Sequence, residues 1–190
     1  MKIFFLGGSF DPPHLAHLEM ARYCLGRCQK FLFIPAEQSP LKKNLPRSDG
    51  IERTRMLELM LNDQPDCEVD LFEFNSGEKN YTIHTISHLK LKYPDTEFTM
   101  LIGKDQIVNF KNWYKYKEIL KQVNILCFNR ISNDGDIPEL EGNIEFVSKY
   151  NMTISSSTIR EMIGERNPDV VECLHPDVWS FIQENGLYQC

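Results

Sequence analysis

The sequence predicts an α/β fold with a doubly wound parallel sheet of about five or six strands, followed by helices at the C-terminal end. Short apolar runs such as Ile3–Leu6 and Phe31–Ile34 alternate with longer stretches in which apolar residues recur at helical spacing. This alternation is typical of parallel strands joined by helical crossovers. No repeat, low-complexity tract or long linker divides the chain, so we expect one domain over residues 1–190, with a closing helical part over about 153–190.

Each expected element carries its own local signal. Apolar runs or strict alternation predict five strands and one further candidate: Ile3–Leu6, Phe31–Ile34, Cys67–Phe74, Phe98–Ile102, Val123–Phe128 and, as the candidate, Ile144–Val147. Helical spacing, caps and terminal prolines predict helices over Leu18–Tyr23, Ile51–Leu61, Thr82–Tyr93, Lys104–Gln122, Ser155–Glu165 and Pro176–Glu184. Residues 37–49 are predicted as a loop because prolines and turn residues interrupt them.

Composition restricts the class of partner. The net charge of -6 argues against nucleic acid as the main partner, because phosphate-backbone binding usually needs a basic surface. No apolar run approaches the roughly 20 residues that cross a bilayer, and no signal-peptide pattern opens the chain, so we expect no membrane partner and a cytoplasmic location. The six cysteines are scattered and complete no zinc pattern, which favours reduced thiols. The sequence is compatible with a homo-oligomer.

One short stretch indicates chemistry on phosphate. An apolar run leads into Gly7-Gly8-Ser9-Phe10, Asp-Pro-Pro follows, and His14 and His17 stand where a helix begins. Paired glycines in a predicted turn let backbone approach a bulky anion, and the helix N-terminus offers free N–H groups and the positive end of its dipole. Histidines three residues apart lie on one helical face, so both can reach the same phosphate.

Other functions of this stretch are less well supported. Gly7-Gly8 lacks the third glycine of a dinucleotide fingerprint, and no Gly-Lys-Ser/Thr follows as in a P-loop. Singly, the glycines would be a tight turn and the histidines exposed helix residues, and a zinc pair would need ligands that do not stand out. The combination favours a functional site, at the edge where ligands bind beyond the carboxyl ends of parallel strands. The predicted strand exits at Gly7, Pro35, Gly103 and Arg130 would share that edge.

The stretch resembles the G-G-x-F-D-P-x-H-x-x-H signature of nucleotidyltransferases that make dinucleotide-type cofactors, and it is most similar to bacterial nicotinate-nucleotide adenylyltransferases. The resemblance runs from Met1 to about Tyr188 and implies a Rossmann-like fold. It implies that His14 and His17 contact the phosphates of ATP and stabilise the pentavalent transition state, with the segment Gly7–Phe10 also binding ATP. Ala16 replaces the glycine that usually precedes the second histidine.

A second motif lies at residues 154–160, Ile-Ser-Ser-Ser-Thr-Ile-Arg. Serines that open a helix are usually caps, but Arg160 one turn later can direct guanidinium donors to the same helix end and clamp a phosphate. The motif resembles the family's I-S-S-T-x-I-R, which holds the β- and γ-phosphates of ATP. The resemblance therefore implies that Ser156, Ser157 and Arg160 bind ATP.

Three further positions are assigned to ATP through the resemblance. Gly103 and Asp105 match a G-x-D pattern whose aspartate meets the ribose, although an aspartate here could equally begin a helix. Arg130 matches an arginine beside the adenine, but Ile131-Ser132 replaces the usual Pro-Gly. In the loop predicted over residues 37–49, Lys42 keeps the charge of the family's Pro-Pro-His-Lys motif, whereas the histidine of that motif is absent.

The resemblance also assigns residues to the second substrate, the nucleotide that accepts the adenylyl group. Tyr81, Thr82 and Thr85 match a Y-T-x-x-T run near nicotinate mononucleotide, and His84 stands where the family often has aspartate. Trp113 matches a tryptophan that stacks near the pyridine ring, although a tryptophan in a helix is more often part of the core.

Together these residues predict adenylyl transfer from ATP to nicotinate mononucleotide, with release of pyrophosphate. His14, His17, Lys42 and Arg160 are the predicted catalytic residues, no protein metal site is expected, and Mg²⁺ enters with ATP. The residues leave open whether the acceptor is instead nicotinamide mononucleotide or pantetheine phosphate. A regulatory nucleotide-binding module without activity is a further alternative, but it would be expected to lack one of the histidines or Arg160.

Overall fold

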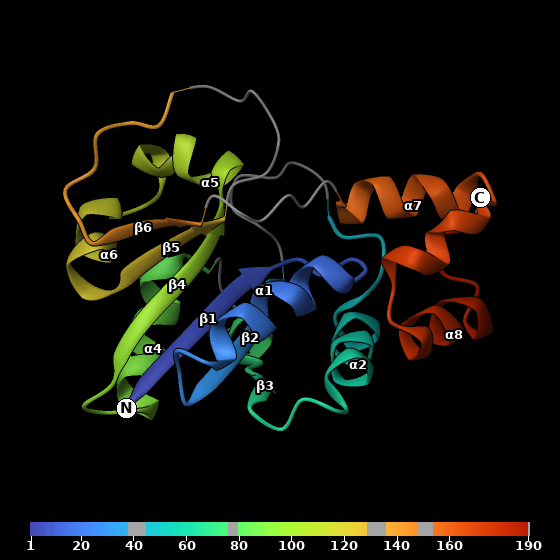
Figure 1. Ribbon diagram of the computed structural model, residues 1–190, viewed down its shortest axis with the longest axis horizontal. Helices are drawn as coiled ribbons and strands as arrows, with labels where there is room; N and C mark the ends of the chain where they lie inside the picture. The colour runs from blue at the N-terminus through green and yellow to red at the C-terminus, as the bar shows by residue number, and fades with distance from the viewer. Residues whose placement is uncertain (38–44, 76–79, 129–135, 148–153, 190) are drawn as a thin grey trace.

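A computed structural model describes residues 1–37, 45–75, 80–128, 136–147 and 154–189. Its centre is a parallel sheet with the strand order β3-β2-β1-β4-β5-β6, in which β1 pairs with β2 on one side and β4 on the other (Figure 1). The strands are β1 (Lys2–Gly8), β2 (Lys30–Pro35), β3 (Cys67–Val69), β4 (Glu97–Gly103), β5 (Asn124–Phe128) and β6 (Ile144–Val147). The predicted doubly wound sheet is therefore confirmed, including the sixth strand.

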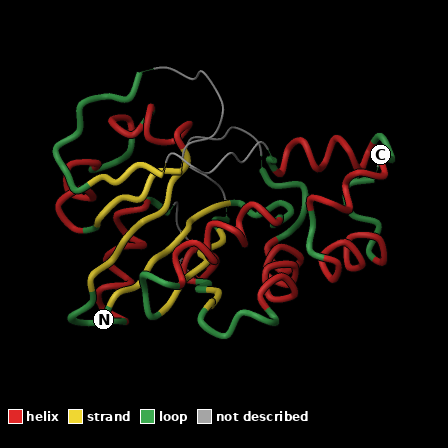
Figure 2. Tube along the Cα trace, viewed as in Figure 1, coloured by secondary structure: helices red, strands yellow, loops and turns green. Residues whose placement is uncertain are grey.

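Helices cover both faces of the sheet (Figure 2). The α-helices are α1 (Leu15–Leu25), α2 (Gly50–Leu61), α3 (Phe72–Asn75), α4 (Thr82–Lys92), α5 (Lys104–Val108), α6 (Tyr116–Gln122), α7 (Ser156–Gly164) and α8 (Pro176–Glu184). Two 3₁₀ turns are η1 (Phe110–Asn112) and η2 (Pro168–Cys173). Within the described part of the chain, no helix is long and apolar enough to cross a membrane.

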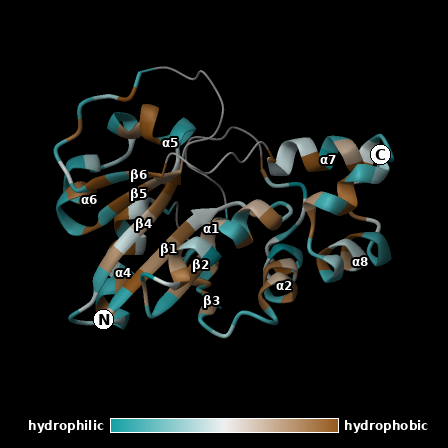
Figure 3. Ribbon diagram, in the orientation of Figure 1, coloured by the Kyte–Doolittle hydropathy of each residue, from teal (hydrophilic) through white to brown (hydrophobic). Residues whose placement is uncertain are grey.

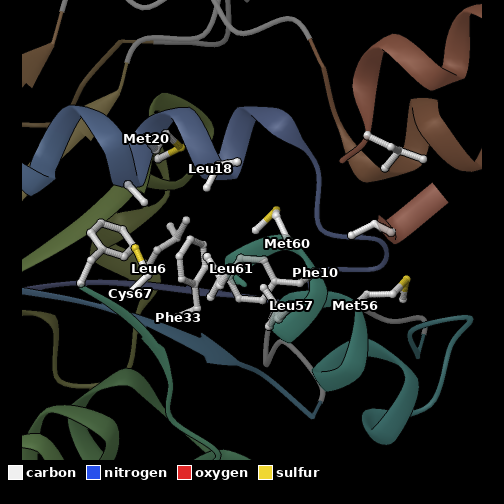
Figure 4. Close-up of a cluster of buried hydrophobic side chains, with 14 of the residues drawn as sticks. Leu6, Phe10, Leu18, Met20, Phe33, Met56, Leu57, Met60, Leu61 and Cys67 are labelled. Carbon is white, nitrogen blue, oxygen red and sulfur yellow. The ribbon is translucent and has the colours of Figure 1, made fainter. Parts of the chain in front are cut away.

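The two faces of the sheet belong to two separate cores, because neighbouring strand residues point in opposite directions. Phe4 and Phe33 lie in the core that α1, α2, α7 and α8 cover, and Leu6 and Met60 of that core are among the side chains in Figure 4. Phe5 lies in the other core, beneath α4, α5 and α6. The central strand β1 is apolar on both faces, and most of it is brown, the hydrophobic colour, in Figure 3.

The strand predicted over Cys67–Phe74 is largely wrong. β3 ends at Val69, and α3 begins at Phe72. The buried Asp70 carboxylate accepts the N–H of Phe72 at 3.0 Å, a local turn that competes with the extended backbone. An alternating apolar pattern cannot reveal this bond.

The single helix predicted over Lys104–Gln122 is also wrong, because the chain breaks twice there. α5 ends at Val108, η1 follows, and α6 begins only at Tyr116. Trp113 is extended, with φ −72° and ψ 138°, and Lys115 adopts the left-handed region at φ 55°. These breaks turn the Trp113 segment out of the helical path and towards the carboxyl edge of the sheet.

Candidate active site

A cavity of about 910 Å³ opens at the carboxyl edge of the sheet, between the ends of β1 and β4. The strand order reverses at these two strands, so the cavity is where an open parallel sheet binds ligands. Every predicted site residue within the described ranges lines it: Gly7, Gly8, Ser9, Phe10, His14, His17, Tyr81, Thr82, Thr85, Gly103, Asp105, Trp113, Ser156, Ser157 and Arg160. Lys42 and Arg130 lie outside the described residues. Four separate parts of the sequence thus share one cavity.

The glycine pair ends a strand rather than forming the predicted turn. Gly7 and Gly8 are the last residues of β1, paired with Ile34 and Pro35. A Cβ on Gly7 would meet no atom within 4 Å, whereas one on Gly8 would lie 3.2 Å from the Phe10 ring. Phe10 itself takes the left-handed backbone at φ 49°. The missing side chain of Gly7 therefore leaves open space, and that of Gly8 leaves room for the Phe10 ring. The left-handed backbone of Phe10 makes the turn.

The two histidines stack on each other at the start of α1. Their ring centroids are 3.7 Å apart at an interplanar angle of 27°, and the Phe10 ring packs edge-on against His17 at 4.9 Å. The backbone N–H of His14 donates to Nδ1 of His17 at 3.2 Å. Because Nδ1 is an acceptor, neutral His17 carries its proton on Nε2, where it can donate to a phosphate oxygen.

The second predicted motif lies directly against the first. Ser155 caps α7 by accepting the N–H of Thr158, while the Ser156 hydroxyl donates to the carbonyl of Pro12 at 2.9 Å. Arg160 donates through Nη1 to the Asp11 carbonyl at 2.5 Å and through Nη2 to Ser157 Oγ at 3.3 Å. These bonds use two of the five guanidinium N–H groups, so others can point into the cavity.

Two buried polar atoms on the cavity wall have no hydrogen-bond partner among the described residues. They are Oδ1 of Asp105, at the start of α5, and Nε1 of Trp113. A buried donor or acceptor without a partner is costly, so such atoms mark places where a ligand can bind. Asp105 offers an acceptor for a hydroxyl, and Trp113 offers a donor beside an aromatic face.

The start of α4 forms another part of the wall. Tyr81 precedes α4 and packs against Tyr114, with ring centroids 4.7 Å apart. The buried Thr85 hydroxyl donates to Oε1 of Glu73 at 2.7 Å, and burial raises the pKa of Glu73. Thr85 therefore lines the cavity with its hydroxyl proton already directed to a carboxylate.

Two structural residues of the site are absent from the sequence prediction. The Asp11 carboxylate accepts the backbone N–H groups of Arg47 and Ser48 at 2.8 and 3.1 Å and the Tyr188 hydroxyl at 2.8 Å. Burial by itself raises the pKa of Asp11, but these hydrogen bonds outweigh it and hold the pKa below its ordinary value.

Arg53, the other missed residue, is 2% exposed. It donates to the carbonyls of Ser9 at 2.8 Å, Ala36 at 2.6 Å and Asp49 at 3.2 Å, and so ties the ends of β1 and β2 to α2. A signal for it does exist in the sequence, because Arg53 falls on the apolar stripe of α2 with Leu57.

No group of three or more His, Cys, Asp or Glu side chains suited to holding a metal ion occurs among the described residues. The cavity lining combines histidines, hydroxyls and an arginine with the separate carboxyl groups of Asp11, Glu73 and Asp105.

Comparison with known proteins assigns the family. Residues 5–162 match the family model described as cytidylyltransferase-like. The chain is 34% identical over 191 residues to the nicotinate-nucleotide adenylyltransferase of Bacillus subtilis, covering 99% of this chain and 98% of the relative. Among solved structures, the nicotinic acid mononucleotide adenylyltransferase of Plasmodium falciparum complexed with NaAD has a TM-score of 0.78 at 21% identity, covering 98% and 97% of the two chains. The same protein complexed with APC has a TM-score of 0.79 at 20% identity, with 98% and 96% coverage.

The parallel sheet, the stacked histidines at its carboxyl edge and the family match define a nucleotidyltransferase of the cytidylyltransferase-like class. Within that class, the chain belongs to the nicotinate-nucleotide adenylyltransferase family. The predicted family is therefore confirmed, whereas the roles assigned to single residues stay predictions.

Proposed function

We propose that the protein transfers the adenylyl group of ATP to nicotinate mononucleotide, giving nicotinate adenine dinucleotide and pyrophosphate in NAD biosynthesis. A phosphate oxygen of the mononucleotide attacks the α-phosphorus of ATP and forms a new P–O bond. The bond from the α-phosphorus to the oxygen bridging to the β-phosphorus breaks, and pyrophosphate leaves with that electron pair. The observation that carries the proposal is the convergence of four separate motifs on one cavity at the β1/β4 switch point.

Catalysis in this proposal is positioning together with stabilisation of charge. His17 donates from Nε2 to the phosphate oxygens, and His14 stacks beneath it and fixes its ring. Arg160 offsets the negative charge that grows on the leaving pyrophosphate, and Lys42 would add a further positive charge. No covalent intermediate is needed, because the mononucleotide phosphate is already an anionic nucleophile at neutral pH.

The two sides of the cavity suit two different ligands. Asp105 offers its unpartnered oxygen to a ribose hydroxyl of ATP, and Trp113 offers a ring face and Nε1–H to the pyridine nucleotide. We expect Mg²⁺ to arrive as the ATP complex and to keep mostly phosphate and water ligands, as this ion commonly does. The cytoplasm stays the expected compartment for an enzyme of this kind.

A panel of acceptors tests the proposal. Pyrophosphate release is measured with Mg·ATP and, separately, nicotinate mononucleotide, nicotinamide mononucleotide and pantetheine phosphate. We expect the highest kcat/KM with nicotinate mononucleotide. A higher value with another acceptor would assign the chain to that substrate, and binding of ATP without release from any acceptor would indicate a regulatory module.

A further inference from the structure

The Asp11 carboxylate has partners from three other parts of the chain. Oδ1 accepts from the Ser48 N–H and the Tyr188 hydroxyl, and Oδ2 accepts from the Arg47 N–H. Nη1 of Arg160 lies 3.5 Å from Oδ2. A carboxylate offers about four acceptor positions, so hydrogen bonds take three of them and Arg160 lies beside the fourth.

The Asp11–Arg160 contact is long for a charge pair. Charge-assisted bonds between arginine and carboxylate usually measure about 2.7–2.9 Å and often form a two-bond fork, whereas the distance here is 3.5 Å. Arg160 instead makes its short bond, 2.5 Å, to the backbone carbonyl of Asp11. The neutral donors on the carboxylate therefore compete with Arg160 and leave its guanidinium partly available to the cavity.

Tyr188 donates a side-chain hydroxyl directly to this carboxylate. Its own oxygen accepts a hydrogen bond from Ser48 Oγ, and only 8% of the residue is exposed. Burial and the neighbouring carboxylate raise the pKa of Tyr188, so the hydroxyl stays protonated and donates. The ring packs in the same core as Ile159 of α7.

We propose that Tyr188 is a positioning residue that keeps Asp11 from capturing Arg160 in a bidentate ion pair. Without the hydroxyl, Oδ1 has a vacant acceptor position, and the carboxylate can turn to take both Nη groups of Arg160. The guanidinium then withdraws from the cavity and holds pyrophosphate less well. This inference rests on the proposed function, because it assigns the free side of Arg160 to the leaving group.

Calorimetric binding of magnesium pyrophosphate tests the inference without any acceptor. Tyr188→Phe keeps the ring and is expected to weaken pyrophosphate binding about tenfold, the size of one hydrogen bond to a charged group. In an Arg160→Ala background the same change should have less than about a twofold effect, because coupled residues are not additive. Tyr93→Phe, at the far end of α4, is the matched control and should bind as the wild type does.

A rescue separates this role from simple structural support. Asp11→Asn removes the charge that could capture Arg160, so Tyr188→Phe combined with Asp11→Asn should bind pyrophosphate more tightly than Tyr188→Phe alone. A purely structural role predicts that the double variant is worse. Ser48→Ala removes the hydroxyl that donates to Tyr188. We expect it to weaken pyrophosphate binding less than Tyr188→Phe does, and to have no effect in the Arg160→Ala background.

Three results would overturn the inference: unchanged pyrophosphate binding in Tyr188→Phe, a full loss in the Arg160→Ala background, or no rescue by Asp11→Asn. The proposed function has a separate failure. Wild-type protein that binds pyrophosphate but releases none from ATP would contradict adenylyl transfer. The comparison of pyrophosphate binding between wild type and Tyr188→Phe would still test the positioning role of Tyr188.

Discussion

Replacing Arg53 with alanine should destabilise the fold strongly, because Arg53 is a buried cation bonded to backbone carbonyls. Its three bonds at 3.2 Å or less go to Ser9, Ala36 and Asp49, and the guanidinium also lies 5.0 Å from the centre of the Phe74 ring. Each carbonyl left buried without a donor costs about 1–3 kcal/mol. Since neighbouring losses are not additive, we expect a loss of about 3–5 kcal/mol in the free energy of unfolding.

Urea and thermal unfolding measure this change. For a chain of this size, 1 kcal/mol corresponds to roughly 2–4 °C in Tm, so Arg53→Ala should lower Tm by roughly 6–20 °C. Arg55→Ala in the same helix is the control: Arg55 is exposed and forms a surface pair with Glu58 at 3.3 Å, so its loss should cost less than about 0.5 kcal/mol. Equal losses in the two variants would refute the idea that Arg53 joins the ends of β1 and β2 to α2.

Three other substitutions test single parts of the site. His17→Ala should lower kcat about 100-fold or more while ATP affinity, measured by calorimetry, changes far less; equal losses would count against a transition-state role. Trp113→Phe keeps an aromatic ring and removes Nε1–H, so KM for the mononucleotide should rise several-fold with KM for ATP unchanged, and the reverse split would assign Trp113 to ATP. Asp11 has a lowered pKa, so its contribution to stability is complete above about pH 4 and is lost as pH falls through the lowered value. Asp11→Asn should therefore make the free energy of unfolding fall less steeply as the pH is lowered. An unchanged dependence on acid pH would show that other carboxylates dominate it.

The fold follows from local patterns to a large extent. The apolar runs of β1, β2, β4 and β5 predict buried strands because both faces of a parallel sheet face a core. The helices α2, α7 and α8 begin close to their predicted starts, because Asp49, Ser155 and a terminal proline cap or open them locally.

Local patterns fail where a buried polar group or a backbone turn decides the path. Asp70 ends β3 by bonding the N–H of Phe72, and a left-handed Lys115 separates Trp113 from α6. Both segments keep a periodic apolar pattern, so the sequence predicts a strand over Cys67–Phe74 and a helix over Lys104–Gln122, and both predictions are wrong. Hydrophobic periodicity reports which side chains are buried, and it does not report where a hydrogen bond redirects the backbone.

For the site, the sequence alone determined which residue types are brought to the sheet edge: paired glycines, two histidines one helical turn apart, a serine-rich helix start and its arginine. Only the tertiary structure decided how these groups are held. Asp11 and Tyr188 are separated by 177 positions and meet in one hydrogen bond. The physical reason is that the local spacing of apolar residues indicates which side chains are buried. The partner of a buried charge depends instead on which distant segments the packed core brings within about 3 Å.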